Sequence, residues 1–283
     1  MRLLYIFLLA LLICSCNSSK DRIVFSSSRN GNSDIFLMNA DGSSQKALTS
    51  DSTEEWAPTI KRNGNITFLR QIENTIVRVS LDPFTGKEQF IPHPQNCMLD
   101  DKNVIYNTIN DDQLYACDGN VFIADSIGAI KINLTDSLGG VAYKPVWYPN
   151  GNKIAFSYNN KKQSDIYSVN IDGSGLINLT QSKYNEEAPD VSPDGKRILF
   201  TSDKDGNNNQ EIYVMDLASR SLENITNSPD WELIARWSSD GESIYYGSNK
   251  DGNWELYSYD LQSKATKRLT TNEVFDGDPR ITH

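Results

Sequence analysis

The chain has few of the residues on which most catalytic and metal sites depend. Of its 283 residues only two are histidines, His93 and His283, and four are cysteines. It shows no pattern typical of a Ser-His-Asp triad, no histidine-rich metal spacing and no Gly-x-Ser-x-Gly nucleophile turn. We therefore predict no catalytic residues, no enzyme activity and no resident cofactor.

An excess of basic charge is also missing. The chain has 27 Lys and Arg residues against 37 Asp and Glu residues, which gives a formal net charge of −10. Nucleic-acid binding needs a basic surface, so this class of partner is excluded. Adhesion of the protein surface to anionic lipid is disfavoured for the same reason. A protein, a neutral glycan or a metal cation stays compatible with the acidic composition.

The one long apolar run, Leu3 to Ile13, lies at the N-terminus after a single positive charge. Eleven residues are too few to span a membrane, and such a run is typical of a signal peptide. It ends in Ile13-Cys14-Ser15-Cys16, which resembles the bacterial lipobox, with small Ser15 directly before Cys16. Ordinary secretory cleavage and a retained membrane anchor are the alternatives.

We expect residues 1–15 to be a lipoprotein signal peptide and Cys16 to be the lipidated N-terminus of the mature chain. Residues 16–20 then form a short tether, and residues 21–283 form the folded domain. This predicts a protein of the bacterial cell envelope, held by lipid at the outer membrane and facing the periplasm or the outside.

What the chain has in abundance is short strand signals separated by turns. The stretch Ala188 to Thr226 contains four of them, divided by Pro193-Asp194-Gly195-Lys196, by the polar loop Asp203 to Asn209 and by Ala218-Ser219-Arg220. Alternating β-rich segments between Pro, Asp, Gly and Asn turns are typical of antiparallel hairpins. One such sheet cannot bury both of its faces alone, so it needs copies of itself.

The copies are present at intervals of 38 to 50 residues. A branched apolar residue that opens each predicted second strand recurs at Ile23, Ile66, Val104, Ile154, Ile198 and Ile244. The third strand recurs as Asp34 to Met38, Asp165 to Val169, Glu211 to Met215 and Glu255 to Tyr259. The fourth strand ends in Leu-Thr or Ile-Thr at Leu48, Leu134, Leu179, Ile225 and Leu269. Four strands in a period near 40 to 45 residues predict a β-propeller.

The Ser-Pro-Asp-Gly turn at Ser192 to Gly195, the Asp/Glu-Ile-Tyr third strand and the Leu-Thr ending resemble the WD-like repeat of the TolB propeller family. The resemblance covers almost everything after residue 20 and is weakest in the second and third repeats. Full TolB proteins carry an α/β domain before the propeller, and only about 20 residues precede it here. We therefore expect a TolB-like propeller without that domain.

The fold class predicted is all-β, a six-bladed β-propeller of four-stranded antiparallel blades. The first repeat starts directly with a second strand at Arg22, whereas the chain ends in Asp278 to His283, which resembles a first strand. A C-terminal strand that completes blade one would close the ring and remove the sheet edges that invite aggregation. We expect a monomer.

Two cysteines remain after the predicted processing. We place Cys97 in the first strand of blade three and Cys117 in an insertion between its second and third strands. An exported chain permits a disulfide between them. Two isolated thiols, packed as small hydrophobic residues, are the alternative.

The connections between blades carry acidic and aromatic residues, and they should meet at one mouth of the central channel. We predict a partner-binding mouth formed by Glu54, Glu55, Trp56, Tyr184, Glu186, Glu187, Trp231, Glu232, Glu273, Phe275, Asp276 and Asp278. Carboxylates around a ring would attract a cation, and aromatic side chains would anchor a partner. The alternative is that the acidic motif belongs to the repeat and only supports a turn.

The sequence thus favours a lipid-anchored envelope module that docks a protein or peptide, as the resemblance to the TolB propeller also implies. A glycan-binding or glycan-cleaving propeller is the second hypothesis, because paired carboxylates can hydrolyse glycosidic bonds. A repeat protein with a purely structural role is the third.

Overall fold

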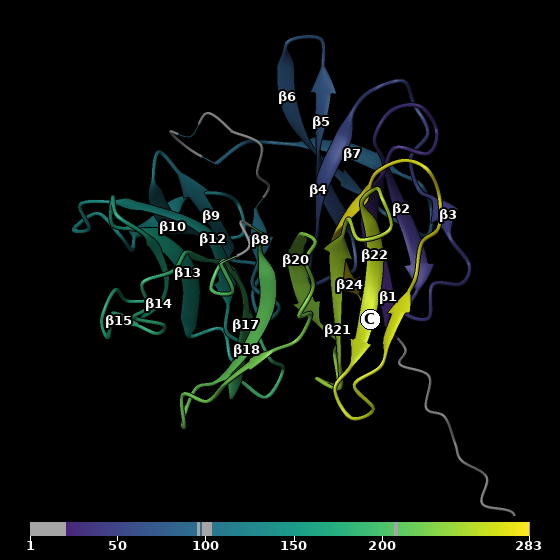
Figure 1. Cartoon of the computed structure of the whole chain (residues 1–283). Coiled ribbons are helices and arrows are strands. Elements are labelled where there is room, and N and C mark those ends of the chain that lie inside the picture. Colours follow the sequence, from purple (N-terminus) through teal and green to yellow (C-terminus); the bar gives the residue numbers. More distant parts are fainter. Residues whose placement is uncertain (1–20, 95–96, 98–103, 207–208, 283) are drawn as a thin grey trace, which may run out of the picture.

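The computed structural model describes residues 21–94, 97, 104–206 and 209–282. These residues form four-stranded antiparallel sheets, six in number, which are arranged as blades around a central axis (Figure 1). The predicted all-β, six-bladed propeller is confirmed. The predicted signal peptide, Cys16, the tether and His283 lie outside the described residues. Over the described ranges, no helix has the length and apolar character needed to cross a membrane.

The strands follow one another from the first to the fourth position in each blade. Blade one holds β24 (Asp276–Thr282), β1 (Arg22–Ser27), β2 (Asp34–Asn39) and β3 (Lys46–Ala47), and blade two holds β4 (Glu55–Ile60), β5 (Ile66–Ile72), β6 (Thr75–Leu81) and β7 (Glu88–Ile91). Blade three holds β8 (Ile105–Tyr106), β9 (Gln113–Cys117), β10 (Asn120–Ala124) and β11 (Ile130–Asn133), and blade four holds β12 (Val141–Trp147), β13 (Lys153–Asn159), β14 (Ser164–Asn170) and β15 (Ile177–Asn178). Blade five holds β16 (Glu186–Val191), β17 (Arg197–Ser202), β18 (Glu211–Asp216) and β19 (Leu222–Asn224), and blade six holds β20 (Glu232–Trp237), β21 (Ser243–Ser248), β22 (Glu255–Asp260) and β23 (Thr266–Arg268).

The C-terminal strand closes the ring, as predicted. Strand β24 pairs antiparallel with β1, with Ile281 opposite Ile23 and Thr282 opposite Arg22. The two ends of the folded chain therefore share one sheet. Removing β24 would expose the edge of β1 as a template for intermolecular pairing.

The hydrophobic core lies between neighbouring blades, which explains why the second and third strands are buried along most of their length. Leu199 and Ile212 of blade five pack in one cluster with Trp237, Ile244 and Tyr257 of blade six. Because a blade has neighbours on both of its faces, side chains that point to either face are excluded from water. Burial of apolar side chains between blades therefore holds the ring together.

The Leu-Thr ending of the repeat has a structural cause. Thr226 accepts a hydrogen bond on Oγ1 from the backbone amide of Ile212 at 3.1 Å, and Thr270 accepts one from Leu256 at 2.9 Å. The threonine thus ties the end of the fourth strand to the third strand of the same blade.

In the Ser-Pro-Asp-Gly turn, the Ser192 hydroxyl donates to Asp194 at 2.5 Å and accepts from the Arg197 amide at 2.9 Å.

Blade three departs from the prediction. Val104 precedes the first strand, β8, rather than opening a second strand, and Cys117 is the last residue of the second strand, β9, rather than part of an insertion. Cys97 belongs to no strand. The cause is the two-residue hairpin turn at Asp118-Gly119, whose φ angles are +49° and +74°. This turn replaces the long polar loop that marks the regular repeats, so the strand count shifts.

Of the two alternatives for Cys97 and Cys117, the structure has the disulfide, with the Cα atoms 5.8 Å apart. Both cysteines are buried in one cluster with Val104, Tyr106 and Tyr115. The bond therefore fastens the segment before β8 to the second strand of the least regular blade.

Candidate functional site

Four of the predicted mouth carboxylates open the first strand of a blade, and all four are buried. Glu55, Glu186, Glu232 and Asp276 expose 0%, 3%, 1% and 0% of their surface. The prediction that these side chains line an open mouth is therefore wrong. Their burial supports the alternative that the acidic motif belongs to the repeat.

Each buried carboxylate has polar neighbours, which compensate part of the cost of burial. Glu55 accepts from Arg70 Nε at 2.5 Å, and Asp276 accepts from Arg29 Nη2 at 2.6 Å. Glu232 instead accepts from the Ser248 hydroxyl at 2.9 Å and has Glu211 as a charged neighbour. Burial raises the pKa of Glu232 to about 7, and repulsion from Glu211 adds to the effect.

The remaining predicted residues are accessible or partly accessible, and most lie on one face. Because neighbouring strands of a blade are antiparallel, the connections between blades and the loops between second and third strands lie at the same face, here called the mouth face. Trp231 and Phe275 expose 43% and 38% of their surface, and Val274 exposes 38%. Glu54 and Glu273 are exposed, whereas Trp56, Tyr184, Glu187 and Asp278 are half-buried.

Hydrogen bonds fix the connections and the starts of the first strands to the adjoining blades. The Trp231 amide donates to Asn249 Oδ1 at 2.9 Å, and the Asp276 amide donates to the Trp254 carbonyl oxygen at 2.9 Å. Glu54 accepts from the Ser33 amide at 2.9 Å. The aromatic residues of the mouth face therefore lie on backbone segments that hydrogen bonds hold in place.

Below the mouth face, the first strands share an unusual backbone feature. A bulge interrupts the register of five of them, and its residue lies in the left-handed region with φ between +49° and +54°. These residues are Ala57, Lys144, Ala188, Ile234 and Asp278. Such a conformation costs on the order of 1–3 kcal/mol in a non-glycine residue, and β-branched Ile234 is the least suited to it.

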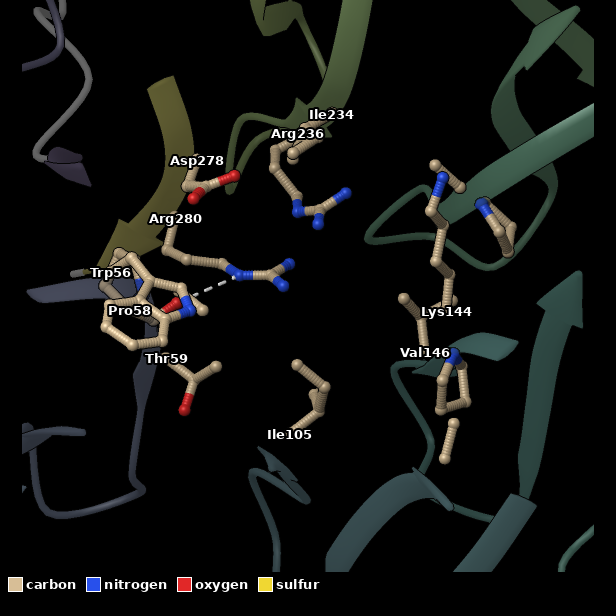
Figure 2. A pocket seen from close by; sticks show the side chains of 15 residues that line it. Trp56, Pro58, Thr59, Ile105, Lys144, Val146, Ile234, Arg236, Asp278 and Arg280 are labelled. Carbon is tan, nitrogen blue, oxygen red and sulfur yellow. Dashed lines mark hydrogen bonds between the residues drawn. The ribbon is translucent and has the colours of Figure 1, made fainter. Parts of the chain in front are cut away.

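All five bulge residues line a cavity of about 260 Å³ in the central channel (Figure 2). Its wall is mostly apolar, with Trp56, Pro58, Ile105, Pro145, Val146 and Pro189 among the lining residues. The charged groups of the lining are Lys144, Arg236, Asp278 and Arg280. Lys144 forms an ion pair with Glu187 at 2.9 Å.

Arg236 and Arg280 were missed by the sequence reasoning, which placed carboxylates around the axis. Each arginine follows the buried carboxylate of its own first strand by four residues, Glu232 and Asp276 respectively. This offset is the sequence signal that could have found them. Guanidinium groups at the axis repel a metal cation, so the channel does not suit the cation that the acidic motif suggested. Among the described residues, no group of three or more His, Cys, Asp or Glu side chains could hold a metal ion.

Fold and channel together define a six-bladed β-propeller with a closed ring and a lined axial cavity. Residues 114–209 match the family model described as the TolB beta propeller domain. That part of the chain, about a third of its length, is similar to the TolB propeller domain.

Two curated proteins resemble parts of the chain. An uncharacterized protein of Agrobacterium fabrum is 31% identical over 109 residues, which are 34% of this chain and 37% of that protein. Dipeptidyl-peptidase 5 of Porphyromonas gingivalis is 45% identical over 47 residues, which are 17% of this chain and 7% of that enzyme. The matched part thus spans about a third of the first relative and a small fraction of the second.

Solved structures share the fold over most of the chain. TolB from Acinetobacter baumannii superposes with a TM-score of 0.76 at 16% identity, covering 93% of this chain and 67% of that one. A chain of a nidogen/laminin complex gives 0.67 at 12% identity, covering 90% and 93%. An oligogalacturonate lyase from Vibrio parahaemolyticus gives 0.53 at 12% identity, covering 82% and 73%. At these identities the likeness establishes the fold alone.

Proposed function

We propose that this propeller is a binding module of the bacterial cell envelope, anchored by lipid at Cys16, which docks a protein or peptide partner on its mouth face. The observation that carries the proposal is the group of exposed apolar side chains Trp231, Val274 and Phe275 at the entrances of β20 and β24. Both strands continue inward to residues that line the axial cavity.

Exposed aromatic side chains on rigid backbone are typical anchors of protein interfaces, because they bury a large area with little loss of conformational entropy. Tyr184 and Trp56 extend the aromatic surface toward blades five and two, and exposed Glu54 and Glu273 supply charge at its rim. Two structures with this fold are TolB and a nidogen/laminin complex, and the second is an assembly of proteins. That fold likeness agrees with a protein partner.

Two features support the envelope location. The N-terminal sequence has the charge, the apolar run and the Cys16 of a lipoprotein signal. The Cys97–Cys117 disulfide fits an oxidising compartment outside the cytoplasm. We expect the module to act as a monomer, since β24 already completes the sheet that would otherwise offer an edge.

A glycan-binding or glycan-cleaving propeller is the second candidate. It is favoured by the fold shared with the oligogalacturonate lyase. The carboxylates that could serve hydrolysis, Glu55, Glu186, Glu232 and Asp276, are buried and engaged with neighbouring side chains. This placement favours protein docking over glycan cleavage.

The test is affinity capture from native membranes with a matched pair of double variants. Trp231→Ser with Phe275→Ser removes two aromatic residues of the mouth face. Phe84→Ser with Phe90→Ser removes two aromatic residues that are more exposed, at 84% and 65%, but lie elsewhere. We expect one protein to be enriched with the unaltered chain and the second variant and lost with the first. Equal enrichment by all three would contradict docking on the mouth face.

A further inference from the structure

Arg236 and Arg280 occupy the same position in adjacent blades, each being the fifth residue of its first strand. Figure 2 shows both guanidinium groups pointing into the axial cavity, Arg236 from β20 and Arg280 from β24. The equivalent position in blade five is Asp190, and in blade two it is Thr59. Two cations therefore meet on one side of a channel whose wall is otherwise largely apolar.

Few protein groups accept hydrogen bonds from these two side chains. Arg236 Nη1 donates to the Ala235 carbonyl oxygen at 2.7 Å, whereas its buried Nε has no acceptor. Arg280 Nε donates to the Pro58 carbonyl oxygen at 3.2 Å. A guanidinium group has five N–H donors in a planar fork. Most of the donors of both residues thus have no acceptor in the described part of the chain, although Arg236 is only 9% exposed.

The neighbouring carboxylates do not neutralise the arginines by direct contact. Across the described residues, no ion pair within 4.0 Å joins Arg236 or Arg280 to a carboxylate, and Asp190 and Asp278 are the acidic groups whose charges act on both arginines. Asp190 Oδ2 accepts from the Trp237 amide at 2.9 Å. Burial, and then repulsion from Arg236, lower the pKa of Arg280 to about 9. An anion between the two guanidinium groups would stabilise their positive charges, which offsets both the cost of burying them and their mutual repulsion.

We propose that Arg236 and Arg280 form a carboxylate-binding site that receives an acidic side chain or the C-terminal carboxylate of a partner peptide. This inference rests on the proposed function and names the group that the partner contributes. Carboxylate suits the planar fork of arginine, which can donate two parallel hydrogen bonds. Pro58, Val146 and Pro189 would contact the apolar part of the inserted residue.

The size of the cavity favours a side chain or chain end over an oligosaccharide. Its volume of about 260 Å³ lies below the range of about 300–1,000 Å³ found for drug-sized ligands. A sugar ring would also need many polar partners, and most of the lining offers none. A partner bound on the mouth face, by contrast, can extend one residue into the channel.

The site is tested by calorimetric titration of the purified full-length mature chain with three small probes. N-acetylglutamate amide carries a side-chain carboxylate, N-acetylalanine carries a terminal carboxylate, and N-acetylglutamine amide is the neutral match of the first. The variants are Arg236→Gln and Arg280→Gln. The control is Arg62→Gln, whose side chain is exposed and lies outside the channel.

We expect at least one carboxylate probe to bind the unaltered chain and Arg62→Gln, and its preference between side-chain and terminal carboxylate identifies the source. Binding to Arg236→Gln and Arg280→Gln should be about ten- to a hundred-fold weaker, the value of one or two charged hydrogen bonds. Arginine Nε–H resonances of the unaltered chain should shift with the carboxylate probe and not with the neutral one, which keeps the test independent of variant folding.

Absence of binding by both carboxylate probes, or equal binding of the neutral probe, would overturn the inference. Tighter binding of inorganic phosphate than of either carboxylate would overturn the choice of carboxylate. These results are separable from the proposed function. A captured partner without probe binding defeats only the channel site, and probe binding without a captured partner defeats only the docking function.

Discussion

Arg29 Nη2 lies 2.6 Å from Asp276 Oδ2, and this ion pair joins residues 247 positions apart in the sequence. Arg29 belongs to the loop between β1 and β2, and Asp276 is the first residue of β24. Asp276 is fully buried, and Asn272 Nδ2 donates a second hydrogen bond to it at 2.6 Å. The pair therefore fastens the C-terminal strand at the point where the ring closes.

Replacing Arg29 by Met should lower the free energy of unfolding by about 2–3 kcal/mol, because it leaves a buried carboxylate without its cation. The control is Lys264→Met, which breaks the exposed Lys264–Glu223 ion pair and should cost less than about 1 kcal/mol. Urea unfolding measures both. If both variants lost the same free energy of unfolding, the Arg29–Asp276 ion pair would contribute no more to stability than an exposed ion pair.

The buried carboxyl group of Glu232 should make stability depend on pH. Its pKa in the folded protein is about 7, above the ordinary value of 4.5, so its stabilising contribution is complete below pH 4.5 and lost as pH rises through 7. Glu232→Gln removes this loss and should raise the unfolding free energy at pH 8 by about 1–3 kcal/mol relative to the unaltered chain.

Thermal or urea unfolding at pH 5 and pH 8 measures this difference. Glu273→Gln, a change on the exposed surface of a neighbouring connection, serves as the control and should change stability little at either pH. A Glu232→Gln variant that is less stable than the unaltered chain at pH 8 would show that the ionised carboxylate is well solvated or paired.

Two glycines with the same backbone conformation should respond differently to alanine. Gly42 and Gly64 both have φ of +85°, but a Cβ atom on Gly42 would lie 2.7 Å from the Leu269 carbonyl oxygen, whereas one on Gly64 meets nothing within 4 Å. Gly64→Ala should cost about 1 kcal/mol for the left-handed conformation alone. Gly42→Ala should cost about 1–3 kcal/mol more, because it forces blades one and six apart. Equal melting temperatures for the two variants would refute this close approach.

Lipidation is tested by a pair of cysteine variants. Cys16→Ser should move the protein from the membrane fraction to the soluble fraction and remove the mass of the acyl groups, because the thiol that carries the lipid is gone. Cys14→Ser should leave both properties unchanged. Fractionation and mass spectrometry of the N-terminal peptide measure the outcome, and the reverse pattern would place the modification at Cys14.

The sequence predicted the blades well where the repeat is regular. Ile154, Ile198 and Ile244 open second strands as expected, since alternation and turn residues act locally. The prediction for blade three was wrong because the Asp118-Gly119 hairpin removes the loop on which the repeat count depends. Local turn chemistry there outweighed the resemblance between repeats.

The site was less predictable, because the direction in which the side chains of the first strands point depends on the bulges in these strands. In Glu186-Glu187 the first side chain is buried and the second is half-buried, and the left-handed Ala188 then shifts the register. A prediction that assumes strict alternation of buried and exposed side chains misses such a shift. For this reason the acidic motif suggested an open mouth lined by carboxylates. The arginines that do line the channel come after the bulge, where the pattern had been lost.

Docking of a partner on the mouth face is tested by site-specific photo-crosslinking in intact cells. A photoreactive residue is placed at Trp231 or Phe275 on the mouth face, and at Phe84 or Ile127 on turns of the opposite face. We expect one crosslinked protein from the first two positions and none from the other two. A product only from positions 84 and 127, or the same product from all four, would contradict it.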